Sequence, residues 1–202
     1  MRILLVAATE AEIAEMARRP REIDVLITGV GMVATAAQTS RALARARYDL
    51  ALNVGVCGSF DRALAPGSVV HVVSDRIAEL GAEDDAEFLT LDDLELPGEP
   101  VFVNAAPPAN AALRRLPSVS GITVNTVHGN ERSIEAVVRR FAPQVESMEG
   151  AAFMYACLIS GVPFAQVRAV SNMVEKRNRE AWQMGEAIGS LGRAAHSILE
   201  CV

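Results

Sequence analysis

Apolar runs that alternate with segments of helical spacing constrain the fold of this chain more than any other feature. Three such runs lie at residues 2–8, 24–27 and 50–56, and helical segments lie between them at residues 10–19 and 32–47. Runs of this kind are typical of strands covered on both faces of a sheet. Strands that alternate with helices form parallel sheets with right-handed crossovers. The sequence therefore predicts an α/β fold.

The rest of the chain continues the alternation. We expect further strands at residues 68–74, 101–103, 121–127 and 164–171, a short strand before residue 149, and helices at residues 109–115, 131–141, 149–160 and 179–200. The acidic, proline-bearing segment 79–100 predicts an irregular excursion on the surface, and the sequence leaves open whether it acts as a lid. Because the sequence has no internal repeat and no linker, we expect one domain spanning residues 1–202.

Composition and charge exclude several classes of partner. The chain has 202 residues, of which half are hydrophobic, and a formal net charge of −6. An acidic chain is a poor ligand for nucleic acid or an anionic membrane surface. No apolar run reaches the length of a membrane span, and no signal peptide is visible. We expect a cytoplasmic protein that binds neither nucleic acid nor membrane.

The cysteines and histidines give no pattern of a metal site or a disulfide framework. Cys57, Cys157 and Cys201 are odd in number, widely spaced and surrounded by apolar residues, which is typical of reduced thiols in a cytosolic protein. The three histidines are scattered without the spacing of metal ligands. We therefore expect no metal.

Residues 146–175 combine buried elements with polar residues at their ends. Helix 149–160 is apolar nearly all round and should be buried, yet Glu149 opens it. A helix N-terminus favours negative charge, so Glu149 has a structural explanation. Alternatively, its carboxylate binds a ligand at the end of a strand, where ligands of α/β sheets collect. The strand that follows the helix ends in the polar pair Ser171-Asn172.

Small or acidic residues stand at four expected strand ends. They are Ala8-Thr9-Glu10-Ala11-Glu12, Gly55-Val56-Cys57-Gly58, Ser147-Met148-Glu149-Gly150 and Arg168-Ala169-Val170-Ser171-Asn172. Their combination and order resemble the purine nucleoside phosphorylase and nucleosidase superfamily, which includes the methylthioadenosine/S-adenosylhomocysteine nucleosidases. The resemblance covers nearly the whole chain. It implies a single-domain, three-layer, nucleoside phosphorylase-like fold, with a central, mostly parallel, twisted sheet flanked by helices, in a homo-oligomer.

Two stretches are most similar to the futalosine hydrolases, which remove hypoxanthine from futalosine in the menaquinone pathway. One is the run Val124-Asn125-Thr126-Val127 followed by VESMEGAAFMYAC, and the other is Ser171-Asn172-Met173-Val174-Glu175 with Arg177, Asn178, Arg179 and Trp182. The resemblance implies hydrolysis of the N-ribosyl bond of a purine nucleoside, a small-molecule substrate, and no cofactor. Cleavage of this bond passes through an oxocarbenium-like state, as in glycoside hydrolysis.

The resemblance also assigns roles to residues of this chain. Glu149 would accept hydrogen bonds from the ribose hydroxyls, with Met148 packed under the sugar. Glu12 would be the base that activates water. The base pocket would be lined by Val56, Cys57 and Gly58. A structural interpretation competes for each acid and glycine, because Thr9-x-x-Glu12 is also a capping box and Gly55 to Gly58 is also a possible tight turn.

Asn172 departs from the adenosine-type nucleosidases, which have aspartate at this position. An amide has no titratable proton, so the role of general acid is in doubt. It can donate its NH2 to a 6-oxo group while its carbonyl accepts from a protonated N7. Asn172 therefore favours a 6-oxopurine as the leaving group, although an asparagine that ends a strand is also a common turn residue.

The acids of the first turn also indicate whether water or phosphate is the nucleophile. Phosphorylases bind phosphate with arginines and main-chain amides. Here the first turn holds Glu10 and Glu12, and loop 28–32 carries no basic side chain, so water is the better nucleophile.

The region beyond Asn172 is a candidate for binding the 5′ substituent. Futalosine carries an aromatic carboxylate there, and Arg177, Arg179 and Trp182 supply cations and an apolar wall. The alternative is a solvated basic loop before the last helix. His128 occupies a position where the nucleosidases stack on the base, but it is equally a candidate surface residue.

Three other functions stay open. They are a methylthioadenosine/S-adenosylhomocysteine-type or other purine nucleosidase, a nucleoside phosphorylase, and a non-catalytic purine-binding module. Asn172 argues against adenine, the lack of a cationic pocket argues against a phosphorylase, and the acids Glu12 and Glu149 argue against a module without activity.

Overall fold

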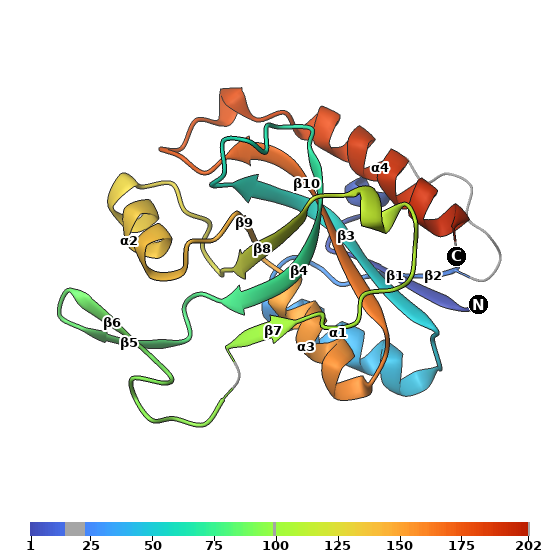
Figure 1. Ribbon diagram of the computed structural model, residues 1–202, viewed down its shortest axis with the longest axis horizontal. Helices are drawn as coiled ribbons and strands as arrows, with labels where there is room; N and C mark the ends of the chain where they lie inside the picture. Colours follow the sequence, from blue (N-terminus) through green and yellow to red (C-terminus); the bar gives the residue numbers. More distant parts are fainter. Residues whose placement is uncertain (15–22, 99, 202) are drawn as a thin grey trace.

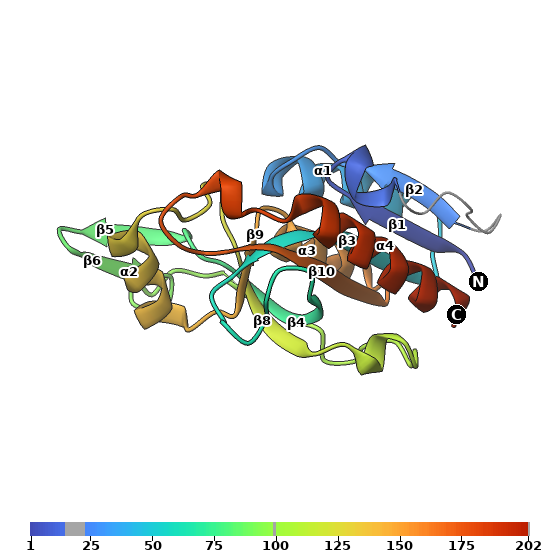
Figure 2. The ribbon, with the colours of Figure 1, turned by 90° about the horizontal axis from the view of Figure 1, so that it is seen from above.

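The computed structural model describes residues 1–14, 23–98 and 100–201, and a mixed β-sheet forms its centre (Figures 1 and 2). The strands of this sheet are β1 Ile3–Ala7, β2 Ile23–Ile27, β3 Leu50–Ser59, β4 Val69–Ile77, β7 Val101–Val103, β8 Ser118–Thr123, β9 Val145–Ser147 and β10 Phe164–Met173. The helices are α1 Met32–Arg45, α2 Glu131–Phe141, α3 Gly150–Ser160 and α4 Met184–Glu200, with 3-10 turns η1 Glu10–Ile13, η2 Leu113–Arg115 and η3 Arg179–Ala181.

The sheet is mostly parallel, as expected, but it closes on itself. Parallel pairs join β1 to β2 and β3, β3 to β10, and β8 to β4 and β9. Antiparallel pairs join β4 to β10, β3 to β9, and β4 to β7. Because β10 pairs with both β3 and β4, the order β10-β4-β8-β9-β3 returns to its starting strand. The sheet is therefore curled into a closed circuit, from which β1 and β2 extend, and the alternation of strands and helices does not reveal this closure.

The alternation of side chains along the strands builds two apolar layers. Leu4 and Val6 of β1 belong to the cluster that packs against α1 and α3, together with the fully buried Phe153. Leu5 and Ala7 belong to the opposite cluster, which includes Leu191 and other residues of α4. The sheet is thus the middle layer between α1 and α3 on one face and α4 on the other (Figure 1). Phe153 is a core residue.

Most predicted elements are confirmed, and two segments between the predicted strands differ from the prediction. Segment 79–100 contains a hairpin of β5 Gly81–Asp84 and β6 Glu87–Thr90 rather than only irregular chain. Asp85 begins its two-residue turn with a φ of 53°, a left-handed conformation that aspartate tolerates. The predicted helix 109–115 is reduced to η2.

Two predicted boundaries are wrong. Polar contacts end one strand earlier than predicted and make the last helix begin later than predicted. The strand expected at 121–127 ends at Thr123, since beyond it Asn125 leaves the sheet and donates its main-chain and side-chain N–H groups to Glu79. The last helix begins at Met184 rather than at residue 179, because the Gln183 N–H donates to the Ser171 carbonyl oxygen at 2.8 Å. Of the helix expected at 10–19, η1 is observed and residues 15–19 lie outside the described part of the chain.

Among the described residues, no helix has both the length and the apolar character that crossing a membrane requires.

Candidate active site

A cavity of about 340 Å³ lies where β1, β3 and β10 end at one edge of the sheet. Parallel strands bring their carboxyl ends to the same edge, which is where ligands of α/β proteins bind. The structure brings most of the predicted site residues to its wall. These are Glu12, Val56, Cys57, Gly58, Met148, Glu149, Asn172 and Trp182.

Glu12 lies in η1, directly after β1, and only 7% of its surface is exposed. Its Oε2 accepts hydrogen bonds from the main-chain N–H and the hydroxyl of Thr9, at 2.9 and 3.1 Å. Its Oε1 accepts from the Val56 N–H of β3 at 3.1 Å. The capping interpretation and the catalytic one are therefore compatible, because Thr9 fixes one oxygen while the other lies against β3 at the cavity wall.

Glu149 precedes α3 and is also buried, yet its carboxylate makes no hydrogen bond to the first amides of that helix. Instead, Oε1 accepts from the Gly31 N–H at 3.0 Å. Gly31 has a φ of 99°, a conformation that favours glycine, and it stands just before α1. The carboxylate therefore joins the starts of two helices at the cavity, a position that a helix dipole alone does not explain.

Cys57 is held as a neutral thiol in the cavity wall. It lies in β3 with 4% of its surface exposed, and burial raises its pKa to about 12. A neutral buried thiol is a wall group and not a nucleophile.

Position 55 requires glycine because two side chains approach its main chain closely. The interpretation of residues 55–58 as a tight turn is therefore wrong. All four residues lie within β3. A Cβ atom at Gly55 would collide with the Arg168 guanidinium group and lie 2.9 Å from Glu12 Oε1. The glycine thus lets a buried cation and the Glu12 carboxylate approach the same point.

Arg168 belongs to a buried polar network beneath the end of the cavity that Glu12 lines. Its Nη2 donates to Asn53 Oδ1 at 2.6 Å and its Nε donates to Gln166 Oε1 at 3.1 Å. Its Nη1 has no hydrogen-bond partner in the described part of the chain. Gln166 Nε2 donates in turn to Asp75 Oδ2 at 3.0 Å, and burial raises the pKa of Asp75 to about 6.

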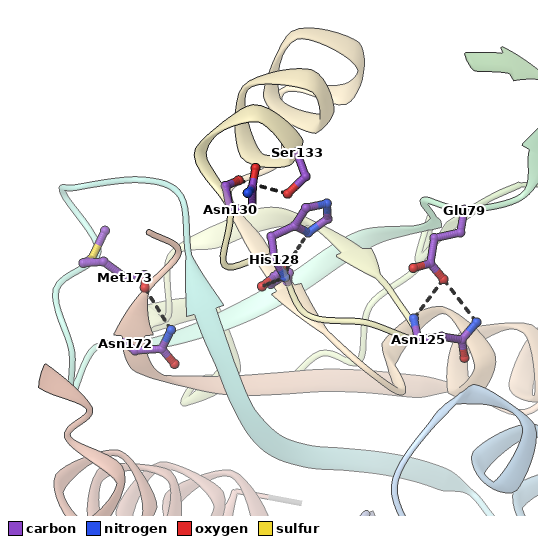
Figure 3. A network of polar contacts seen from close by, with 8 residues as sticks. Glu79, Asn125, His128, Asn130, Ser133, Asn172 and Met173 are labelled. Carbon is purple, nitrogen blue, oxygen red and sulfur yellow. Dashed lines mark hydrogen bonds and ion pairs between the residues drawn. The ribbon is translucent and has the colours of Figure 1, made fainter. Parts of the chain in front are cut away.

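Asn172, near the end of β10, has an amide orientation that its neighbours define. Its Nδ2 donates to the Met173 carbonyl oxygen at 2.9 Å, as Figure 3 shows. Because a carbonyl only accepts, the NH2 group must lie on that side. The Ser171 hydroxyl lies 2.8 Å from Asn172 Oδ1. The second N–H of the amide is therefore available to a ligand.

A smaller cavity of about 250 Å³ adjoins the first, and Gly58, Asn172 and Trp182 line both. Arg177 lines the smaller cavity, and its guanidinium carbon lies 5.5 Å from the centre of the Trp182 ring. Arg179 starts η3, is exposed, and lines neither cavity. The structure therefore brings two of the three candidates for the 5′ substituent together.

Two further polar residues lie at the cavities. The sequence does not indicate Glu146 as a site residue, and it leaves two roles open for His128. Glu146 of β9 lines both cavities, and His128 lines the smaller one. Their side chains form an ion pair at 2.7 Å if the histidine is protonated. The available signal was an acid inside a strand three residues before Glu149, but spacing does not show which way a strand residue faces.

The described residues contain no group of three or more His, Cys, Asp or Glu side chains arranged to hold a metal ion.

Comparisons with known proteins identify the family of the chain. The profile of the phosphorylase superfamily matches residues 21–202. Futalosine hydrolase of Streptomyces coelicolor is 36% identical over 183 residues, covering 86% of this chain and 77% of that protein. Futalosine hydrolase of Thermus thermophilus is 33% identical over 180 residues, covering 86% of this chain and 80% of that protein.

A solved structure shows the same fold. Futalosine hydrolase of Helicobacter pylori superposes with a TM-score of 0.83 at 15% identity, covering 100% of this chain and 98% of that one. The profile and the sequence relatives lead to one conclusion: the chain belongs to the phosphorylase superfamily and, within it, to the futalosine hydrolase family.

Proposed function

We propose that this protein hydrolyses the N-ribosyl bond of futalosine and releases hypoxanthine and dehypoxanthine futalosine, as a step of menaquinone biosynthesis. One observation carries the proposal: two buried carboxylates and an amide whose NH2 is oriented by a main-chain carbonyl line a single cavity. The relationship to the futalosine hydrolases supports the proposed reaction.

The two carboxylates suit the ribosyl half of the reaction. Breaking the N-ribosyl bond leaves positive charge on the sugar, as in glycoside hydrolysis. Glu149, with one oxygen fixed by Gly31, accepts hydrogen bonds from the ribose hydroxyls and places negative charge near that centre. Glu12 takes a proton from the attacking water, since its carboxylate is held in place by Thr9 and Val56.

Asn172 suits the departing base. The free N–H of its amide donates to O6 of a 6-oxopurine as negative charge develops there. A carboxylate at this position would instead present an acceptor to O6. The fixed amide orientation therefore supports hypoxanthine over adenine as the leaving group.

Water, rather than phosphate, is the nucleophile in this proposal. The described residues that line the larger cavity include Glu12 and Glu149 but no lysine or arginine. Two carboxylates repel a phosphate ion, and a phosphorylase would need cationic donors there.

We further propose that Arg177 and Trp182 bind the aromatic carboxylate at the 5′ end of the substrate. Replacing Arg177 with glutamine should raise KM for futalosine by about 10-fold, the cost of one charged hydrogen bond. KM for inosine, which lacks the 5′ substituent, should not change. The matched control is Arg179→Gln, on an exposed arginine outside both cavities. Equal effects of the two variants, measured by steady-state kinetics, would assign the arginines to the solvated loop.

The function is tested by incubating the protein with futalosine, inosine or methylthioadenosine, with and without phosphate, and following the free bases by chromatography. Release of hypoxanthine from futalosine without phosphate is the expected result. Release of adenine from methylthioadenosine alone would contradict the 6-oxopurine assignment. A strict requirement for phosphate would identify a phosphorylase, and no release from any nucleoside would favour a binding module.

We also propose that the protein is a homo-oligomer. Apolar side chains on the outer surface support this, because they are exposed although they lie at or near α1 and α3. They are Val30, Val33, Tyr155, Leu158 and Ile159. Val30 also lines the larger cavity, so a second copy on this surface would lie next to the substrate. Analytical ultracentrifugation at micromolar concentration tests the proposal, and a single monomer peak would contradict it.

A further inference from the structure

Glu146, a buried carboxylate that the proposed mechanism does not use, lies beside Asn172 in the sheet. Gly58 of β3 pairs with Glu146 of β9 on one side and with Asn172 of β10 on the other. A Cβ atom at Gly58 would lie 2.8 Å from Val174 Cγ2, 3.4 Å from Asn172 Nδ2 and 3.5 Å from Glu146 Cγ. The Glu146 and Asn172 side chains therefore lie over the same face of Gly58, and only a residue without a side chain fits between them and Val174.

The carboxylate of Glu146 keeps unused acceptor capacity. Its Oε1 accepts from the His128 main-chain N–H at 3.1 Å, and its Oε2 lies 2.7 Å from His128 Nδ1. A carboxylate has about four lone-pair positions, and His128 occupies two of them. Glu146 is 3% exposed, so bulk water does not readily serve the remaining ones. Because Glu146 lines both cavities, a ligand bound there lies beside this carboxylate.

His128 orients this carboxylate. Since Oε2 only accepts, Nδ1 must carry the proton, and the ring lies edge-on to Phe60 with centroids 6.2 Å apart. The loop that carries His128 is itself anchored at Asn125, which Glu79 holds (Figure 3). His128 is thus a positioning residue, and Glu146 is the group that faces the cavity.

We infer that Glu146 accepts the N1–H of the 6-oxopurine and, with Asn172, determines the specificity for the base. This inference rests on the proposed function. A 6-oxopurine presents an acceptor, O6, next to a donor, N1–H, and an amide NH2 beside a carboxylate matches that pair. Adenine presents the reverse pattern, a donor amino group next to the acceptor N1, and places the N1 lone pair against the carboxylate. A site built to hydrogen-bond one pattern rejects the other because its buried polar groups are left unpaired.

The experiment measures binding of free bases by isothermal titration calorimetry, which does not depend on catalysis. Glu146→Gln is close to isosteric, and its amide can donate to N1 of adenine. The ratio of hypoxanthine to adenine affinity should fall by about 10- to 100-fold in this variant, the range for one charged hydrogen bond. The matched control is Glu131→Gln, an exposed acid in the first turn of α2 that lines neither cavity, which should leave the ratio unchanged. A purely structural role for Glu146 would weaken both bases equally and would overturn the inference.

A second measurement uses the unaltered protein and keeps the inference testable if the variant does not fold. Hypoxanthine should bind about 10- to 100-fold more tightly than 1-methylhypoxanthine, which lacks the N1–H. Equal affinities would overturn the role of Glu146 even if futalosine is hydrolysed. If the protein neither releases hypoxanthine from futalosine nor binds the free base, the proposed function itself fails, and the inference fails with it.

Discussion

The two ends of the cavity hold their polar groups in different ways. At the ribose end, the Glu12 and Glu149 carboxylates accept from main-chain N–H groups of Val56 and Gly31. At the base end, Asn172 donates to the Met173 carbonyl oxygen and Glu146 accepts from the His128 main-chain N–H, but each also has a side-chain partner, the Ser171 hydroxyl for Asn172 and the His128 ring for Glu146. Main-chain donors are present whatever the side chains are, whereas side-chain partners change with the sequence. The ribose end is therefore suited to chemistry shared by many nucleosidases, and the base end to the choice of substrate.

The layers beneath the two ends differ as well. Under the ribose end lies the buried polar network of Arg168, Gln166 and Asp75. Under the base end lies an apolar cluster that includes Cys57, Val145 and Val170. Changes at the ribose end should therefore affect the rate of every substrate, and changes at the base end should affect the preference among substrates.

The largest effect is expected for Glu12→Gln. Glutamine has similar size but cannot take a proton from water, so kcat should fall by about 10²- to 10⁴-fold. Steady-state release of base from futalosine and inosine measures the effect, which should be the same for both. Glu10→Gln is the matched control, since Glu10 is an exposed acid of the same η1 turn. A Glu12→Gln variant with normal kcat would leave the capping box as the only role of Glu12.

Glu149→Gln should lower kcat/KM by about 10- to 100-fold, because charged hydrogen bonds to the ribose are replaced by neutral ones. The loss should be equal for 6-oxo and 6-amino nucleosides if this end is indifferent to the base. The control is Glu131→Gln, which removes an acid from the first turn of α2. If both variants lower the thermal midpoint by a similar amount and neither lowers kcat/KM, Glu149 is only a partner of the helix dipole.

Asn172→Asp should change the preference between 6-amino and 6-oxo nucleosides more than it changes kcat. A carboxylate beside O6 is repelled, while beside adenine it accepts from the amino group. The kcat/KM ratio of 6-amino to 6-oxo nucleosides should rise about 5- to 10-fold, the value of roughly one hydrogen bond. Asn130→Asp is the matched control, because the N-cap of α2 accepts from the Arg132 N–H and an aspartate preserves that contact. An unchanged ratio in both variants would make Asn172 a turn residue.

The difference between the ends also explains what the sequence could predict. Glu12, Glu149 and Asn172 stand at the ends of local elements, so their position relative to one strand or helix indicates that they meet at one edge. Glu146 lies inside β9, and only the non-local antiparallel pair of β9 with β3 turns its side chain toward Asn172. That same pair helps to close the sheet, which the order of strands and helices does not reveal. Arg179 failed to reach either cavity for a related reason, because nearness in sequence does not fix the direction of a side chain in a short 3-10 turn.

The smallest effect concerns the network under the ribose end and is a change in stability. Burial raises the pKa of Asp75 to about 6 from its ordinary value of 3.8, so the folded state disfavours its charged form. Well below pH 4 the group is protonated in both states. As the pH rises from about 4 to about 6, the unfolded state loses this proton first, and the free energy of unfolding falls.

Asp75→Asn removes that dependence. Relative to the variant, the unaltered protein should lose stability between about pH 4 and pH 6, by at most about 1.4 kcal/mol per pH unit for one proton, and the difference should be constant above pH 7. Urea unfolding at several pH values measures it. Cys57→Ala in the apolar layer under the base end is the control, because a thiol with a pKa of about 12 does not titrate in this range. A flat difference curve for Asp75→Asn would mean that the network keeps Asp75 ionised throughout, because the hydrogen bonds from Gln166 and Thr123 and the charge of Arg168 together outweigh burial.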